Sequence, residues 1–324
     1  MEPIEQVGHS QSKLHSVLLT GVSGYVGGRL LSLLQKEPVV LRCLVRNTAR
    51  IDDLVAKSTE VVQGDVMDRS SLEKAMHGVD TAYYLIHMMS GSKDFEKQDR
   101  QAAINFAEAA KTAGVKRIIY LGGLGDDSTE ELSPHLRSRH EVGNIFSNSG
   151  VETIEFRASL VIGDGSISFD LVKTLTDRLP VMLCPRWLTT PTQPIAIDDV
   201  LSYLMAAKDL PPGQSQIFEI GSEDVTTYGG IIREYARQRG LRRWLIYVPV
   251  LTPYLSSLWL TLVKRSSFEV GRHLIEGLKN PTVVQDHRAL KVFPIHPMSL
   301  KDAIAMTIAR SLNPLENQSD SLRN

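Results

Sequence analysis

Residues 16–30 read Ser-Val-Leu-Leu-Thr-Gly-Val-Ser-Gly-Tyr-Val-Gly-Gly-Arg-Leu, and this stretch decides the fold. A short apolar run, Ser16–Thr20, leads into a glycine-rich turn, and leucines with helical spacing follow over Arg29–Gln35. Glycine allows a positive φ in a sharp turn, and it lets the backbone approach a pyrophosphate and pack closely on a strand. The free N–H groups at a helix N-terminus then face the phosphates. The stretch predicts a pyrophosphate site at Gly21, Gly24 and Gly27, together with Ser23, Tyr25 and Val26 between them.

Strand and helix patterns alternate along the chain after this turn. Further strands are expected at Val39–Val45, Glu60–Gln63, Thr81–His87, Arg117–Leu121, Thr153–Ile162 and Gln216–Ile220. Helical patterns are expected at Ile51–Ala56, Ser70–Met76, Phe95–Ala113, Pro134–Ser147, Tyr228–Arg239 and Leu300–Ser311. Such alternation is typical of a parallel sheet with helices on both faces. The pattern predicts an α/β protein with a Rossmann-type, doubly wound parallel sheet and a smaller mixed C-terminal substrate region.

The domain organisation follows from where this regular pattern ends. From about Leu179 onward prolines cluster and the alternation loosens. We expect an NAD(P)-binding Rossmann domain over residues 13–180, with later strands from about 193–222, and a C-terminal substrate or partner region over 181–324. Within that region Trp244–Val263 has no charged residue and is about as long as a membrane span. Its prolines favour a loop and helix beside an apolar substrate, but contact with a membrane surface or a protein complex, and even a span, stay open.

Composition narrows the class of function. The chain has 324 residues, a formal net charge of −1 and a pI near 6.8, so no basic excess points to nucleic acid. Its two cysteines, Cys43 and Cys184, have neither disulfide-framework nor zinc-site spacing, and no metal site is expected. Residues 1–13 are polar and lack the apolar run of a signal peptide, which predicts a cytoplasmic protein.

The end of the second expected strand indicates which dinucleotide is bound. An NAD site usually places an acid there for the ribose 2′-hydroxyl. This chain has Arg46 at that point, and a guanidinium can bind a 2′-phosphate bidentately. NADP(H) is therefore preferred, with NAD(H) possible. After the third strand, Asp65 and Val66 stand where they could flank an adenine, although Asp65 could equally cap a turn.

Several motifs, in order, resemble the atypical, extended short-chain dehydrogenases/reductases. They are Thr20–Leu30, Leu44–Asn47, Gly64–Asp68, Tyr120–Gly125, Arg157–Gly165 and Gln193–Val200. Residues 134–143 and 179–197 resemble the NmrA-like NAD(P)H-binding proteins related to the nucleotide-binding accessory subunit of respiratory complex I. The resemblance implies that Leu85, Ile86 and His87 line the inner ribose. It also implies that Arg157, Ser159 and Leu160 pass near the nicotinamide carboxamide.

The family's Tyr-x-x-x-Lys pair is where the chain departs from that pattern. His135 and Arg139 stand at the i and i+4 positions expected for the tyrosine and lysine. Imidazole titrates near neutral pH, so His135 could donate the proton while Arg139 holds the cofactor ribose. Alternatively, the reductase chemistry is lost or redirected, His135 is structural or contacts the cofactor, and Arg139 merely helps to bind the dinucleotide.

Three functions remain open from sequence. The first is an NADPH-dependent oxidoreductase acting on a small apolar carbonyl or quinone-like substrate. The second is a non-catalytic NADP(H)-binding redox sensor or an assembly factor of a respiratory complex. The third is an epimerase or dehydratase, for which no acid/base pair is evident. The substrate and the oligomeric state are not indicated.

Overall fold

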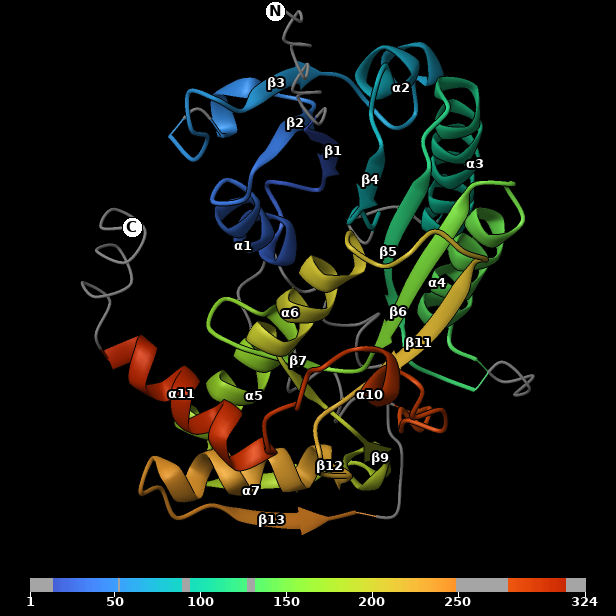
Figure 1. Ribbon diagram of the computed structural model, residues 1–324. Coiled ribbons are helices and arrows are strands. Elements are labelled where there is room, and N and C mark those ends of the chain that lie inside the picture. The colour runs from blue at the N-terminus through green and yellow to red at the C-terminus, as the bar shows by residue number, and fades with distance from the viewer. Residues whose placement is uncertain (1–13, 52, 89–93, 127–131, 249–278, 313–324) are drawn as a thin grey trace, which may run out of the picture.

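A single parallel sheet forms the centre of the protein. The computed structural model describes residues 14–51, 53–88, 94–126, 132–248 and 279–312. Seven strands pair in the order β11-β6-β5-β4-β1-β2-β3, and every pairing between neighbours is parallel (Figure 1). The strands are β1 (His15–Thr20), β2 (Val39–Val45), β3 (Glu60–Gln63), β4 (Thr81–Tyr84), β5 (Arg117–Gly123), β6 (Glu152–Ala158) and β11 (Gln216–Ile220). The predicted Rossmann-type α/β fold is confirmed.

Helices bury both faces of this sheet. Adjacent strand residues point to opposite faces, so Val17 and Leu19 pack with one cluster and Leu18 with the other. The first cluster includes residues of α1 (Tyr25–Leu34) and α6 (Ile197–Ala207). The second includes α2 (Arg69–Met76), α3 (Phe95–Ala113) and α4 (Pro134–Ser147). Because both faces of the central strands are covered, β1 and β5 contain consecutive buried apolar residues, such as Val17–Leu19 and Ile118–Tyr120.

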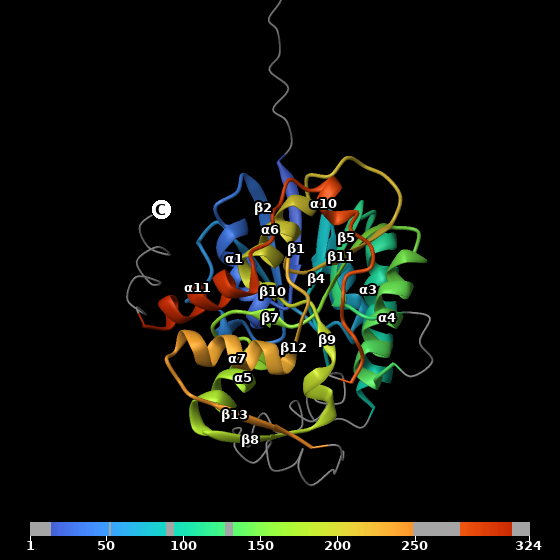
Figure 2. The ribbon, with the colours of Figure 1, turned by 90° about the horizontal axis from the view of Figure 1, so that it is seen from below.

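The chain after β6 builds a third apolar cluster beside the sheet. Besides α6 and β11, the described chain after β6 forms β7 (Val161–Ile162), α5 (Ile167–Arg178), β8 (Val181–Cys184), η2 (Arg186–Thr189), β9 (Pro191–Thr192), β10 (Ile195–Ala196), β12 (Thr226–Thr227), α7 (Tyr228–Gln238), β13 (Trp244–Tyr247), α10 (Ala289–Val292) and α11 (Leu300–Leu312). Phe169, Trp187 and Tyr235 are among the buried side chains of this cluster. Figure 2 shows α5, α7, β8 and β13 gathered on one side of the molecule.

Several boundaries differ from the sequence predictions. Helix α1 begins at Tyr25 and not at Arg29, because the glycine turn is itself the start of the helix. The strand expected at Thr153–Ile162 is interrupted, since β6 stays in the large sheet while β7 pairs with β10. No helix forms over the described residues of 51–56; the turn η1 (Thr48–Arg50) precedes them. Helix α5 was not predicted, because β-branched residues weaken its helical signal.

The apolar segment Trp244–Val263 is only partly described. Its first four residues form β13, which pairs in parallel with β8. Residues 249–263 lie outside the described residues. Across the described part of the chain, no helix combines the length and apolar character that a membrane crossing requires.

Candidate functional site

The strand order creates a crevice at the carboxyl ends of β1 and β4. The chain leaves β1 toward β2 on one side, whereas it leaves β4 toward β5 on the other. In open α/β sheets this point of divergence is where a dinucleotide binds, because no connection covers it. The turn after β1 and the segment after β4 therefore form the two walls of the candidate site.

Glycines in the turn after β1 occupy space that no side chain could share. Gly21 has φ +75°, and a Cβ there would lie 2.3 Å from the carbonyl oxygen of Leu85. A Cβ at Gly27 would lie 2.2 Å from the carbonyl oxygen of Gly21. The turn thus folds tightly back on both its own helix and the segment after β4. Only glycine permits this geometry, which fits a backbone cradle for a pyrophosphate.

The N-terminus of α1 completes the cradle. Its N-cap is Gly24, which provides no side-chain cap, and its first turn contains no acidic residue. The first N–H groups and the positive end of the helix dipole are thus available to an anion. The side chain of Tyr25 turns away, toward Gly163 and Gly165 after β7, and burial raises its pKa to about 12. Tyr25 and Val26 can contribute backbone N–H groups, and Ser23 is exposed beside them.

The residues assigned to the adenosine lie at the ends of β2 and β3. Arg46 is exposed directly after β2, and its guanidinium makes no hydrogen bond or ion pair with the described residues. Asp65 accepts a hydrogen bond from Met67 N–H at 2.9 Å, so its carboxylate closes a turn. Val66 is buried in the cluster beneath the sheet. The geometry therefore leaves Arg46 as a charged side chain open to a ligand at this end.

Two histidines meet at the other end of the crevice. His87 follows β4 after Leu85 and Ile86, and His135 lies in the first turn of α4. Nε2 of His87 lies 3.0 Å from Nδ1 of His135, and the ring centroids are 4.8 Å apart. The helix begins here because Ser133 accepts a hydrogen bond from Leu136 N–H and Pro134 occupies the first helical position. Local capping thus places His135 against the segment after β4.

A buried carboxylate lies behind His87. Asp99 of α3 has a side chain 2% exposed, and its Oδ2 lies 3.0 Å from Nδ1 of His87. It also accepts hydrogen bonds from Ser138 Oγ and from Met88 N–H, each at 2.9 Å. Burial opposes its ionisation, but the hydrogen bonds outweigh this and lower the pKa of Asp99. Sequence reasoning missed Asp99 and Ser138. The available signal was a carboxylate on the apolar face of the helix, four residues after Phe95 and three before Ala102.

Two arginines assigned to the site are engaged elsewhere. Arg139 donates to the carbonyl of Leu121, and its guanidinium lies 5.1 Å from the ring centroid of Tyr120. Arg157 is 3% exposed, and its Nε donates to Glu155 at 2.8 Å. Both cations therefore stabilise the ends of β5 and β6. Their predicted contacts with the dinucleotide stay predictions.

Leu160 belongs to the third apolar cluster, and Ser159 directly before it contacts two threonine hydroxyls. Ser159 Oγ lies 2.7 Å from Thr192 Oγ1 and 2.6 Å from Thr282 Oγ1, and these two threonine oxygens are 2.9 Å apart. Hydrogen bonds to this group partly offset the rise that burial causes in the pKa of Tyr228. The hydroxyls tie the end of β6 to β9 and α7, and the predicted contact of Ser159 with the dinucleotide stays a prediction.

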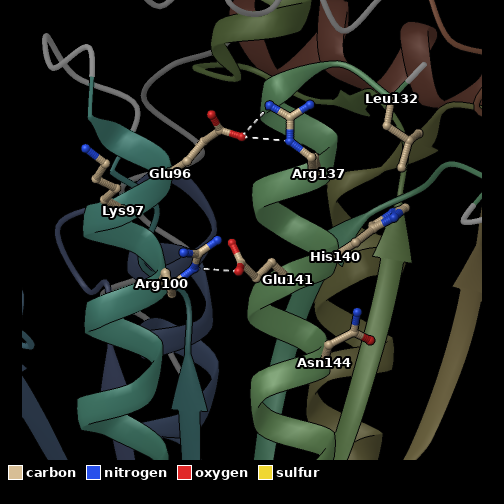
Figure 3. A pocket seen from close by; sticks show the side chains of 8 residues that line it. All are labelled: Glu96, Lys97, Arg100, Leu132, Arg137, His140, Glu141 and Asn144. Atoms are coloured by element: carbon tan, nitrogen blue, oxygen red, sulfur yellow. Dashed lines mark hydrogen bonds and ion pairs between the residues drawn. The ribbon is translucent and has the colours of Figure 1, made fainter. Parts of the chain in front are cut away.

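A pocket of about 690 Å³ lies between α3 and α4 (Figure 3). Its lining charges pair across the two helices: Arg100 with Glu141 at 2.5 Å and Arg137 with Glu96 at 2.7 Å. Exposed pairs of this kind contribute little stability each, but they hold the facing surfaces of the helices together. Asp99 and Ser138 stand next to these pairs in sequence. The two ion pairs thus join α3 and α4, the helices that carry Asp99 and His135.

Comparison with known proteins identifies an NAD(P)H-binding domain in this chain. Residues 21–153 match the family model described as NAD(P)H-binding. An NAD(P)H azoreductase of Xenophilus azovorans is 31% identical over 109 residues, which are 34% of this chain and 36% of the azoreductase. The chain therefore matches little more than a third of that relative's length.

Solved structures share the fold over almost the whole chain. A triphenylmethane reductase of Citrobacter sp., in complex with NADP(H), has a TM-score of 0.71 at 17% identity. That alignment covers 90% of this chain and 99% of the reductase. An NADPH-dependent quinone oxidoreductase of Escherichia coli, complexed with NADPH, has a TM-score of 0.67 at 18% identity. It covers 90% of this chain and 99% of the oxidoreductase.

Proposed function

Because residues 21–153 match a family model described as NAD(P)H-binding, and the motifs of the chain resemble those of the atypical, NmrA-like short-chain dehydrogenases/reductases, we propose that it is an NADPH-dependent oxidoreductase. The substrate class we propose is a small apolar carbonyl or quinone-like compound. The bound dinucleotide supplies the hydride. The chain's own residues must hold the cofactor, exclude water and deliver a proton to the oxygen that is reduced.

One observation carries the proposal: a hydrogen-bonded imidazole stands where the family's tyrosine is expected. His135 is partly exposed and lies at the crevice end opposite the adenosine residues. Its ring is anchored through His87 to a buried carboxylate, as an acid–base group needs to be. Arg139 cannot replace the family's lysine in a proton relay because guanidinium does not deprotonate. His135 is therefore the proposed general acid.

The proposed preference for NADP(H) rests on Arg46. Its guanidinium is exposed at the end of β2, and no acid occurs in residues 42–51 to accept a hydrogen bond from a ribose 2′-hydroxyl. The relatives in complex with NADP(H) and NADPH lend support. An azoreductase, a triphenylmethane reductase and a quinone oxidoreductase among the similar proteins favour reduction of flat apolar compounds.

The experiment has two arms. Calorimetric titration of the purified protein with NADPH and NADH tests the site, and we expect micromolar binding of NADPH that is at least about tenfold tighter than that of NADH. Oxidation of NADPH is then followed at 340 nm with a panel of quinones, aldehydes and azo compounds. Tight binding with no turnover on the whole panel would instead favour a dinucleotide sensor or an assembly factor. Weak binding of both nucleotides would reject the proposal.

A further inference from the structure

The cluster Asp99–His87–His135 has a fixed direction of hydrogen bonding. An ionised carboxylate has acceptors only, so His87 must carry its proton on Nδ1 to bond Asp99 Oδ2 at 3.0 Å. Nε2 of neutral His87 is then an acceptor. The contact of 3.0 Å to His135 requires that Nδ1 of His135 be the donor. With His87 neutral, the ionised carboxylate of Asp99 thus sets the direction of both hydrogen bonds in the cluster.

This direction leaves Nε2 of His135 as the variable position. When His135 is neutral, Nε2 has a lone pair; when His135 is an imidazolium, Nε2 carries a proton. The imidazolium form makes the cluster neutral overall, because its positive charge offsets the negative charge of buried Asp99. A buried carboxylate favours such a counter-charge strongly.

Resting on the proposed function, we infer that Asp99, acting through His87, keeps His135 as an imidazolium whose Nε2–H supplies the proton for reduction. As the carbonyl carbon takes up hydride with its electron pair, the C=O π pair moves to oxygen. The oxygen takes the proton from Nε2 of His135, so one N–H bond breaks and one O–H bond forms. His135 becomes neutral with Nδ1–H still on His87, and solvent reprotonates Nε2. His87, Asp99 and Ser138 are positioning residues in this scheme.

Among the described residues, the ionisable groups near the cluster include two tyrosines, an arginine and a third histidine. Tyr84 of β4 and Tyr120 of β5 are buried, which raises the pKa of each phenol well above its ordinary value and keeps both neutral. Arg139 of α4 is a nearby cation, so it disfavours the imidazolium and makes the Asp99 charge more necessary. His140 of α4 contacts the carbonyl of Gly123 at 2.9 Å.

The test is the protonation state of His135 in the full-length protein, measured with ¹⁵N-histidine labelling and long-range ¹H–¹⁵N NMR over pH 5 to 9. His135→Gln and His87→Gln assign the signals. In the wild type we expect the neutral ring of His135 to carry Nδ1–H, and its imidazolium to persist above the ordinary histidine pKa of about 6.5.

Asp99→Asn should reverse the direction of the hydrogen bonds along the cluster. Its Oδ1 can still accept from Met88 N–H, but its amide would donate to Nδ1 of His87 and force Nε2–H on that ring. We expect the neutral tautomer of His135 to switch to Nε2–H, and its protonation constant to fall about tenfold or more. Asp199→Asn is the matched control, since Asp199 is also buried and accepts a backbone N–H, from Met298, at 2.8 Å. It should leave His135 unchanged.

Ser138→Ala provides a second, milder variant. Without the hydrogen bond from Ser138 Oγ, the Asp99 carboxylate interacts more strongly with His87. The protonation constant of His135 should therefore rise, by a smaller factor than the fall expected in Asp99→Asn. An unchanged tautomer and titration of His135 in both variants would overturn the inference. So would an active Asp99→Asn enzyme whose pH profile of kcat matches that of the wild type.

The two proposals fail in different ways. The NMR titration needs neither cofactor nor turnover, so it tests the cluster even if no substrate is reduced. Loss of NADPH binding in the wild type would reject the oxidoreductase while the titration still decides the coupling of Asp99 to His135. In an active enzyme, Asp99→Asn should lower kcat and move its pH profile to lower pH, with the Kd of NADPH unchanged.

Discussion

The two ends of the crevice are built by different means. The proposed pyrophosphate end is formed by the backbone: a turn of glycines, one helix N-terminus and the close approach of Gly21 to the segment after β4. The proposed proton-donor end is formed by side chains: an aspartate from α3 and histidines from the segment after β4 and from α4. The first end depends on residues within one turn of each other. The second depends on how α3 and α4 pack on the sheet, so a change there can spare the fold and the cofactor while it removes the chemistry.

The strongest test of this contrast is Gly21→Ala. With φ +75° and the Leu85 carbonyl 2.3 Å from the new Cβ, we expect a loss of more than about 3 kcal/mol in the free energy of unfolding and no measurable NADPH binding. Gly114→Ala is the control, because Gly114 has φ +74° with nothing within 4 Å of a Cβ. It should cost about 1 kcal/mol and keep binding. Urea unfolding and calorimetry measure both, and equal NADPH affinities would contradict a pyrophosphate cradle at Gly21.

His135→Ala removes the proposed proton donor and leaves the glycine turn unchanged. We expect kcat to fall by about 10²- to 10⁴-fold, as for removal of a general acid, while the Kd of NADPH stays within about twofold. The control is His77→Ala, an exposed histidine at the end of α2. Steady-state kinetics on the best substrate of the panel decides the matter. Full turnover in His135→Ala would show that another group donates the proton.

Arg46→Asp sharpens the comparison at the adenosine end. Replacing the exposed guanidinium by a carboxylate should weaken NADPH by about 10- to 100-fold and leave NADH unchanged or tighter. Arg242→Asp makes the same change of charge at an exposed position before β13 and should have no such effect. Calorimetry with both nucleotides is the measurement. If the ratio of the two affinities does not move, Arg46 does not select NADP(H).

The smallest expected effect is the pH dependence of stability at Asp99. Its pKa in the folded protein is lowered, so the stability from its charge is fully present above the unfolded value of about 3.9 and is lost as pH falls through the lower folded value. The stability difference between wild type and Asp99→Asn should therefore narrow, by about 1 kcal/mol, between pH 5 and pH 3. Urea unfolding at both pH values measures it.

Asp199 provides the opposite sign. Burial raises the pKa of Asp199, so its ionisation lowers the stability of the folded protein. The free energy of unfolding of the wild type should therefore rise relative to that of Asp199→Asn as pH falls from 5 to 3. If the two aspartates show the same trend with pH, the hydrogen bonds to Asp99 do not offset its burial.

Much of the fold was predictable because it is encoded locally. The alternation of apolar runs and helical periods located the seven strands of the sheet, and β2 and β3 match their predicted bounds. Asp198 and Asp199 open α6 as expected for carboxylates near a helix N-terminus. The strand predicted at Thr81–His87 ends at Tyr84; Leu85 then lies against Gly21, and His87 contacts Asp99 and His135. That departure is a tertiary event without a local signal.

The sequence by itself determined the strand–turn–helix unit at Gly21–Gly27 and, through it, a site for NAD(P)H. A glycine's conformational freedom and a helix's free N–H groups are properties of short stretches of chain, which explains why this end could be recognised. Only the tertiary structure brought Asp99 and Ser138 to His87 and His135, and turned Arg139 and Arg157 toward other partners. The contacts among Asp99, Ser138, His87 and His135 join residues 12 to 48 positions apart, because a buried charge finds its partners through the packing of whole helices.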